Sequence, residues 1–266
     1  MISRCGPLID YLPRVYYLLR DAAARLSQFA DLRGGNFVVL DVETTDHVVD
    51  SSVWRLAAIA VHGFEVIDSY SQWVRIARAQ YDAAFGDLDE DAREALRREL
   101  HMDWNKIESG IPIVEALSGV EDFVAKYPGP VVSHNGYAFD LPVLTAEARR
   151  SGSLFQAPLE RVLDTGALTK AAQCGLQMTP METPFTFFLR VEEERAKEIY
   201  WSLSYIVEQL FQIPRHLLHD PRVDCCVVGM YVDFVLNGVE SHLRRPKWQE
   251  ALHGSSSNGT PDSTSG

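Results

Sequence analysis

Apolar residues follow two spacings along this chain, and the change from one to the other predicts the order of helices and strands. Residues 9–30 repeat apolar positions every three or four residues, which predicts an amphipathic helix. The repeating positions are Leu12, Tyr16, Leu19, Ala23 and Leu26. We expect the N-terminal segment 1–33 to dock on the core of the protein, with targeting or contact with a protein partner as the alternatives.

Short apolar runs rich in β-branched residues predict five strands. They lie at residues 36–43, 53–61, 64–74, 130–133 and 161–163. His62-Gly63 separates the second and third runs, which predicts a tight antiparallel hairpin. Helical patterns follow both late strands, so the sequence predicts an α/β protein with a five-stranded mixed sheet flanked by helices.

Two regions depart from this pattern. The stretch near 80–106 is acidic and helical in spacing, which predicts a solvated insertion helix and leaves open a contact with a protein partner. Residues 254–266 are rich in Ser, Gly and Thr without apolar periodicity, which predicts disorder at the end of a C-terminal extension, 240–266. Residues 34–239 remain as one domain.

Composition limits the function classes. With 266 residues and 46% hydrophobic content, the chain can build one sizeable core. A net charge of −12 argues against a broad grip on duplex DNA, since phosphate binding draws on Lys and Arg. No apolar run approaches the roughly 18 residues of a membrane span, and the four cysteines have no metal-binding spacing. We expect an intracellular protein, cytoplasmic or nuclear, that does not bind membranes.

Two carboxylates, Asp41 and Glu43, lie at the C-terminal end of the first predicted strand. Side chains alternate faces along a strand, so both project to one side if the strand continues through Glu43. They would repel each other, whereas a hard divalent cation such as Mg²⁺ or Mn²⁺ would be bound by both. An isolated pair of this kind also occurs in ordinary acidic turns.

Asp140 lies between the predicted strand at 130–133 and a helical pattern at 141–150. Aspartate at such a junction is typical of a helix N-cap, because it accepts hydrogen bonds from the first free N–H groups. A metal ligand is the alternative interpretation.

A third acidic stretch begins at His219. Asp220-Pro221 is typical of a helix start, and the apolar run 225–236 predicts a buried helix. Asp224 then lies about one turn inside that helix, while His219 lies just outside it.

The order and spacing of these stretches resemble the DEDDh, or DnaQ-like, superfamily of 3′-to-5′ exonucleases. The matching stretches are Asp41-Val42-Glu43-Thr44-Thr45, the seven residues from His134 to Asp140, and the six residues from His219 to Asp224. The resemblance covers roughly residues 36–236 and implies a ribonuclease-H-like exonuclease fold. It departs from the family at Asp46, where many members have glycine, which puts the details of substrate docking in doubt.

The resemblance also implies the roles of the site residues. The implied ligands of two Mg²⁺ or Mn²⁺ ions are Asp41, Glu43, Asp140 and Asp224. His219 would take the proton of the attacking water, because an imidazole with a pKa of about 6.5 is available as a neutral base. The implied contacts to the terminal nucleotide are Thr44, Thr45 and Asn135, with turn hydroxyls as the alternative for the threonines. His134 and Asp164 are expected to be structural.

The implied function is a metal-dependent 3′-to-5′ exonuclease that hydrolyses phosphodiester bonds at single-stranded DNA or RNA ends and releases nucleoside 5′-monophosphates. Two other functions remain open. One is an exoribonuclease restricted to short RNA or RNA 3′ ends. The other is a nuclease-derived protein that binds nucleic acid, or serves as a scaffold, without turnover.

Overall fold

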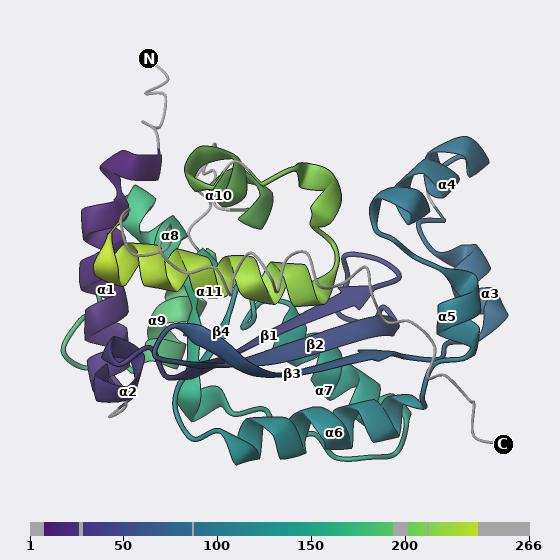
Figure 1. Cartoon of the computed structure of the whole chain (residues 1–266), viewed down its shortest axis with the longest axis horizontal. Helices are drawn as coiled ribbons and strands as arrows, with labels where there is room; N and C mark the ends of the chain where they lie inside the picture. Colours follow the sequence, from purple (N-terminus) through teal and green to yellow (C-terminus); the bar gives the residue numbers. More distant parts are fainter. Residues whose placement is uncertain (1–7, 27–28, 87, 194–201, 212, 239–266) are drawn as a thin grey trace, which may run out of the picture.

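The computed structural model describes residues 8–26, 29–86, 88–193, 202–211 and 213–238. The C-terminal extension at 240–266, with its expected disorder, lies outside these ranges. Figure 1 shows a central sheet with helices on both faces and a group of helices beyond one end of the sheet.

The sheet matches the prediction in all five strands. The strands are β1 (Phe37–Thr44), β2 (Val53–His62), β3 (Glu65–Trp73), β4 (Val131–Ser133) and β5 (Val162–Asp164). Their order is β3-β2-β1-β4-β5, with β2 antiparallel to both β1 and β3, and β4 parallel to both β1 and β5. The predicted five-stranded mixed sheet is therefore confirmed.

The predicted hairpin between β2 and β3 is also present. Gly63 and Phe64 have φ angles of 59° and 62°, as a two-residue turn between antiparallel strands requires. A positive φ is unfavourable for phenylalanine, but the Phe64 ring packs edge-on against Phe37 with 6.1 Å between centroids. This contact offsets the backbone strain and holds the turn of the hairpin against the start of β1.

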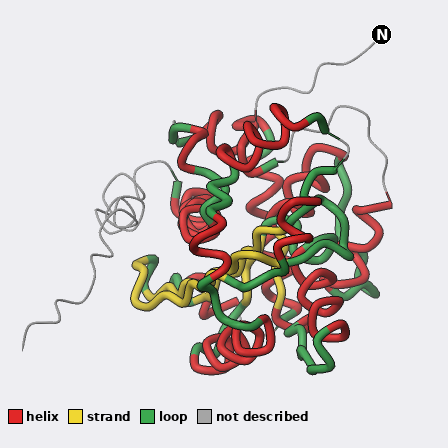
Figure 2. The backbone as a smooth tube through the Cα atoms, turned by 90° about the vertical axis from the view of Figure 1, so that its right-hand side faces the viewer, coloured by secondary structure: helices red, strands yellow, loops and turns green. Residues whose placement is uncertain are grey.

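Helices cover both faces of the sheet. The remaining α-helices after the N-terminal segment are α3 (Arg78–Ala83), α4 (Glu90–Glu99), α5 (Trp104–Glu108), α6 (Ile113–Lys126), α7 (Asp140–Arg150), α8 (Thr165–Cys174), α9 (Pro184–Glu193), α10 (Leu203–Leu210) and α11 (Pro221–Asn237), with 3-10 turns η2 (Leu159–Arg161) and η3 (Arg215–Leu217). Helix α11 packs on β1 and β2, while α6 and α7 contact the sheet from the other side (Figure 1). Figure 2 shows the strands lying between helices. None of the helices in the described ranges is long and apolar enough to cross a membrane.

Helix α11 is the predicted buried helix. Asp220 caps it by accepting the backbone N–H of Arg222 at 3.0 Å, and Pro221 occupies the first turn, where its missing N–H removes no helix bond. The Cys225 thiol is buried against the sheet and donates to the carbonyl oxygens of Val39 and Ala57. Helix α11 is thereby fixed across β1 and β2.

The N-terminal helix differs from its prediction over residues 9–30. The chain forms a 3-10 turn η1 (Leu8–Asp10), helix α1 (Leu12–Arg25) and helix α2 (Phe29–Arg33). Proline in the first turn of α1 starts a new helix there, because it cannot continue a preceding one. The apolar face of α1 packs on α8, which confirms that it docks on the core.

The acidic insertion also differs, since it contains three helices, α3 to α5, instead of one. Its apolar residues gather around Trp54 of β2 in a cluster separate from the main core. The cluster includes Ile76, Phe85, Leu100, Met102 and Ile107. Most residues of α3 and the outer face of α4 are exposed, while the apolar cluster anchors the insertion at the end of the sheet where β1 ends and α11 begins (Figure 1).

Candidate active site

The two carboxylates of β1 share one face, because the strand continues through Thr44. Burial raises the pKa of Asp41 well above its usual value, and the negative charges of Asp140, Asp224 and Glu43 raise it further. Burial and the charge of Asp224 likewise raise the pKa of Glu43. The end of β1 therefore brings together carboxyl groups that are costly to ionise unless a cation binds them.

Asp140 belongs to this cluster and is not a helix cap. Phe139 occupies the N-cap position of α7, and Asp140 is the first helical residue. Its Oδ1 accepts the backbone N–H of Val42 at 3.2 Å, which ties it to β1 between Asp41 and Glu43. The carboxyl is 3% exposed, and burial raises its pKa to about 7.

Asp224 lies one turn inside α11 with its two oxygens in different environments. Oδ2 accepts the backbone N–H of His219 at 3.0 Å. Oδ1 is buried, and none of the described residues donates a hydrogen bond to it. Burial raises the pKa of Asp224 to about 8. A buried carboxylate oxygen without a donor is costly unless a cation or water binds it.

His219 is held beside the carboxylates by its backbone. It adopts a left-handed conformation with φ 64°, and its Nδ1 lies 3.9 Å from Oε1 of Glu43. The side chain is 41% exposed, and burial of the rest lowers its pKa. The His219 ring is therefore neutral near neutral pH and can accept a proton.

Three of the predicted residues form a group with metal-ligand spacing. One donor atom each from Glu43, His219 and Asp224 lies within 4.8 Å of the other two. Asp41 and Asp140, two of the expected ligands, adjoin this group but do not belong to it. The set of buried carboxylates and the unbonded Oδ1 of Asp224 fit a divalent cation.

The predicted substrate contacts on β1 have partners within the turn. The Thr44 hydroxyl donates to the carbonyl oxygen of Asp46, and the Thr45 hydroxyl accepts the N–H of Ser52 at 3.0 Å. Both threonines are buried. Asp46 does not have a positive φ, so the backbone at this position does not require glycine. Contacts to a nucleotide stay a prediction.

Asp164, at the end of β5, holds the loop that contains Asn135 and precedes Asp140. Asn135 has φ 72°, and its N–H donates to Oδ1 of Asp164 at 3.0 Å. Asp164 also accepts the N–H groups of Tyr137 and Ala167, which confirms its predicted structural role. The His134 ring hydrogen-bonds the Thr165 hydroxyl at 3.0 Å, as expected of a structural residue. A nucleotide contact by Asn135 stays a prediction.

The sequence patterns did not indicate that Arg55 lies at the site. It lies opposite Glu43 across the β1–β2 pair, and its guanidinium donates to Oδ2 of Asp220 at 2.8 Å. It is 8% exposed, and its charge lowers the pKa of both Glu43 and Asp224. The available signal was an arginine inside the otherwise apolar run of residues 53–61.

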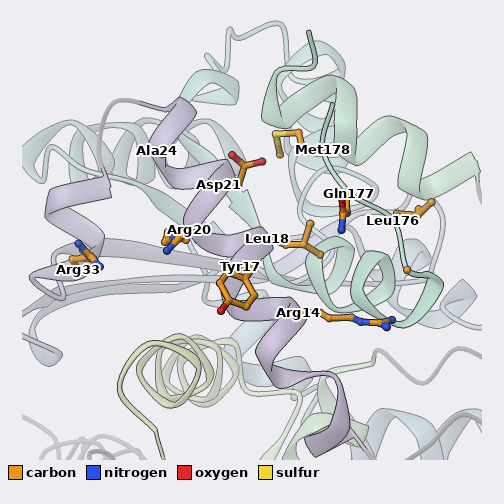
Figure 3. A pocket seen from close by; sticks show the side chains of 11 residues that line it. Arg14, Tyr17, Leu18, Arg20, Asp21, Ala24, Arg33, Leu176, Gln177 and Met178 are labelled. Carbon is orange, nitrogen blue, oxygen red and sulfur yellow. The ribbon is translucent and has the colours of Figure 1, made fainter. Parts of the chain in front are cut away.

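A large cavity lies away from these residues. It has a volume of about 770 Å³ and lies between α1 and the segment after α8 (Figure 3). Its charged lining residues are Arg14, Arg20, Asp21 and Arg33. None of the predicted site residues contributes to it.

No protein-family model and no curated protein sequence matches this chain. Solved structures do match. The zinc-bound complex of Escherichia coli exonuclease I with single-stranded DNA has a TM-score of 0.52 at 14% identity, covering 83% of this chain and 43% of the other. The chain has the fold of exonuclease I. This likeness confirms the predicted ribonuclease-H-like fold.

Other exonuclease I structures match with similar TM-scores, sequence identities and coverages. A complex of the E. coli enzyme with a dA16 oligonucleotide has a TM-score of 0.52 at 13% identity, covering 76% of this chain and 41% of the other. An exonuclease I structure described as suggesting how processivity is achieved has a TM-score of 0.53 at 13% identity, covering 81% and 45%. The chain therefore spans less than half the length of these exonuclease I chains.

Proposed function

We propose that this protein is a metal-dependent 3′-to-5′ exonuclease that releases nucleoside 5′-monophosphates from single-stranded DNA or RNA. The observation that carries the proposal is the convergence of four carboxylates, three buried and one half-buried, and one histidine where β1 ends and α11 begins. They are Asp41, Glu43, Asp140, Asp224 and His219. The exonuclease I fold, solved with single-stranded DNA in other proteins, supports nucleic acid as the substrate.

Electrostatics favour a cation site over a purely structural role for these carboxylates. Burial and mutual repulsion raise their pKa values, so ionising them together costs free energy in the folded protein. Arg55 offsets only part of this charge and is itself paired with Asp220. Groups whose pKa values are strongly perturbed by burial and by specific neighbours are typical of functional sites.

Mg²⁺ or Mn²⁺ fits the donor atoms, because both ions prefer carboxylate oxygens. Asp41, Glu43, Asp140 and Asp224 would hold two ions. When bound, the ions would stabilise the charge on the entering and leaving oxygens of the phosphodiester. The chain contributes the position of each carboxylate: β1 aligns the first pair, the Val42 N–H orients Asp140, and the His219 N–H orients Asp224.

His219 would accept the proton of the attacking water. The lowered pKa keeps its ring neutral near neutral pH, and the ring is open enough to reach solvent. Its backbone N–H is bonded to Asp224, so the base and the carboxylate are held in a fixed relation.

The proposal is tested with 5′-labelled single-stranded DNA and RNA incubated with Mg²⁺ or Mn²⁺. We expect a ladder of products shortened from the 3′ end, abolished by a chelator and by Asp41→Asn. The substitution preserves the shape of the side chain, and circular dichroism checks that the variant is folded. Intact substrates with folded, metal-supplied protein would contradict the proposal, and retained binding would then favour the non-catalytic alternative. Cleavage of RNA alone would favour an exoribonuclease.

A further inference from the structure

A second cavity, of about 590 Å³, adjoins the carboxylate site. We name it the basic groove, and its principal lining residues are Arg55, Trp73, His101, Lys106, His216 and Arg222. They come from β2, β3, the insertion, η3 and the start of α11. The groove therefore joins parts of the chain that are distant in sequence.

The basic groove is next to the proposed catalytic residues. Asp220 lines it and directly follows His219 in the sequence. Arg55 lines it as well and faces Glu43 across the β1–β2 pair. His101 lines it too, and its ring hydrogen-bonds the carbonyl oxygen of His216, which is close to His219 in the sequence. A single-stranded nucleic acid whose last nucleotide lies at the carboxylates can therefore continue into this groove.

The charge of the groove is opposite to that of the whole chain. Arg55, Lys106 and Arg222 bring three cations, and Asp220 brings one carboxylate, which Arg55 already pairs. The chain as a whole has a net charge of −12. A local excess of positive charge beside a negatively charged site suits a ligand that bears phosphates along its length.

Trp73 contributes an aromatic ring to the groove, which packs on Trp54 with 5.5 Å between ring centroids. Its ring lies 4.6 Å from the guanidinium carbon of Arg55 and 5.3 Å from the ammonium nitrogen of Lys106. The ring is partly exposed within the cavity. Aromatic rings next to cations are the usual means by which proteins bind single strands without reading their sequence.

The acidic insertion forms one wall of the groove. Nε2 of His101 hydrogen-bonds the carbonyl oxygen of His216 at 2.8 Å, which joins the end of α4 to η3. Lys106 lies on α5, and the apolar cluster around Trp54 anchors both helices to the sheet. The insertion thus shapes the groove with its basic residues, while the acidic residues of α4 lie mostly toward solvent.

We propose that the basic groove binds the phosphates and bases on the 5′ side of the nucleotide held at the carboxylates. This inference rests on the proposed function for the direction of the strand. It assigns Lys106 and Arg222 to phosphate binding and Trp73 to base stacking.

The test measures the affinity of a short fluorescent single strand by anisotropy, in a chelator that prevents hydrolysis. The double variant Lys106→Ala/Arg222→Ala should raise the Kd about tenfold at moderate salt. It should also reduce the slope of log K against log[salt] by about 1.4, at about 0.7 for each lost phosphate contact. Lys106→Arg/Arg222→Lys should keep the wild-type slope, which separates charge from folding.

Arg14→Ala/Arg20→Ala is the matched control, since it removes the same charge from the cavity in Figure 3. We expect wild-type affinity and slope. An unchanged slope for the groove variant, an equal loss in the control, or no salt-dependent binding by the wild type would overturn the inference. Groove-dependent binding without hydrolysis would support it and contradict the proposed function. Hydrolysis by a protein whose binding does not depend on the groove would support the proposed function and contradict the inference.

Discussion

Glu43 and Arg55 are cross-strand partners in the β1–β2 pair, and the charge of Arg55 lowers the pKa of Glu43. The same guanidinium binds Asp220 at the start of α11. One buried arginine therefore links the strand that carries Glu43 to the helix that carries Asp224. The fold and the geometry of the proposed site depend on each other at this residue.

Replacing Arg55 should be costly for stability. In Arg55→Met, Asp220 and Glu43 lose their buried counter-charge, and breaking such a pair typically costs about 3 kcal/mol. Urea denaturation measures the change in the free energy of unfolding. Arg78→Met is the control, because its pair with Asp82 is more than half exposed and should contribute less than about 1 kcal/mol. If both variants lost the same small amount of free energy of unfolding, this role for Arg55 would be contradicted.

The metal-free protein should lose stability as the pH rises. Burial raises the pKa of Asp140 to about 7 and that of Asp224 to about 8, whereas an unfolded aspartate ionises near pH 4. Between these values the unfolded state releases protons that the folded state retains, so the free energy of unfolding falls as the pH rises. Divalent ions, when bound, would take the place of these protons on the carboxylates.

Melting temperatures with and without Mg²⁺ or Mn²⁺, measured across this pH range, check the prediction. The stabilisation by metal should grow with pH, because the carboxylates that bind it must ionise. Asp140→Asn should show a weaker fall in metal-free stability, since one titrating group is gone. A metal effect that is independent of pH would contradict the account.

Two buried aspartates should respond in opposite ways to the same substitution. Asp140→Asn can still accept the Val42 N–H and removes a repelling charge, so the metal-free protein should stay at least as stable near pH 8 while hydrolysis is lost. Asp164→Asn weakens an acceptor of three N–H groups and should cost about 2 kcal/mol while leaving hydrolysis detectable. Thermal melts and the oligonucleotide assay separate the two cases. The account fails if Asp164→Asn alone abolishes hydrolysis in folded protein.

His219 can be a base or a metal ligand, and His219→Ala distinguishes them. As a base, its loss should slow hydrolysis by about 10² to 10⁴ while the metal-induced rise in melting temperature persists. The distance of 3.9 Å to Glu43 also allows the ring to bind an ion. Loss of both hydrolysis and metal stabilisation would assign His219 to the metal.

Local patterns in the sequence were enough for the sheet and for the placement of Glu43 on β1 and of Asp224 near the start of α11. The β-branched run before Asp41 predicts a strand, and the two-residue period places Glu43 on the same face. Asp220-Pro221 predicts the start of α11, because each residue satisfies a requirement of the first helical turn. These features depend on neighbouring residues alone.

Contacts between distant segments could not be predicted in this way. The side chain of Asp140 bonds Val42 instead of capping its own helix, and that bond joins residues 98 positions apart. Arg55 reaches Asp220 across 165 positions. The insertion folds into three helices because Trp54, on β2, gives its apolar residues a surface to pack on. Each outcome was decided by tertiary packing rather than by local preference.

Hydrolysis of a single strand in water enriched in ¹⁸O, with Mg²⁺ or Mn²⁺, is the most direct test of the central claim. The account predicts nucleoside 5′-monophosphates released from the 3′ end, each with the label in its phosphate, because water is the nucleophile in phosphodiester hydrolysis. Mass spectrometry of the released nucleotides detects the label, and Asp140→Asn should release none. Release of unlabelled nucleotides, of 3′-monophosphates, or of no nucleotide by folded protein would contradict it.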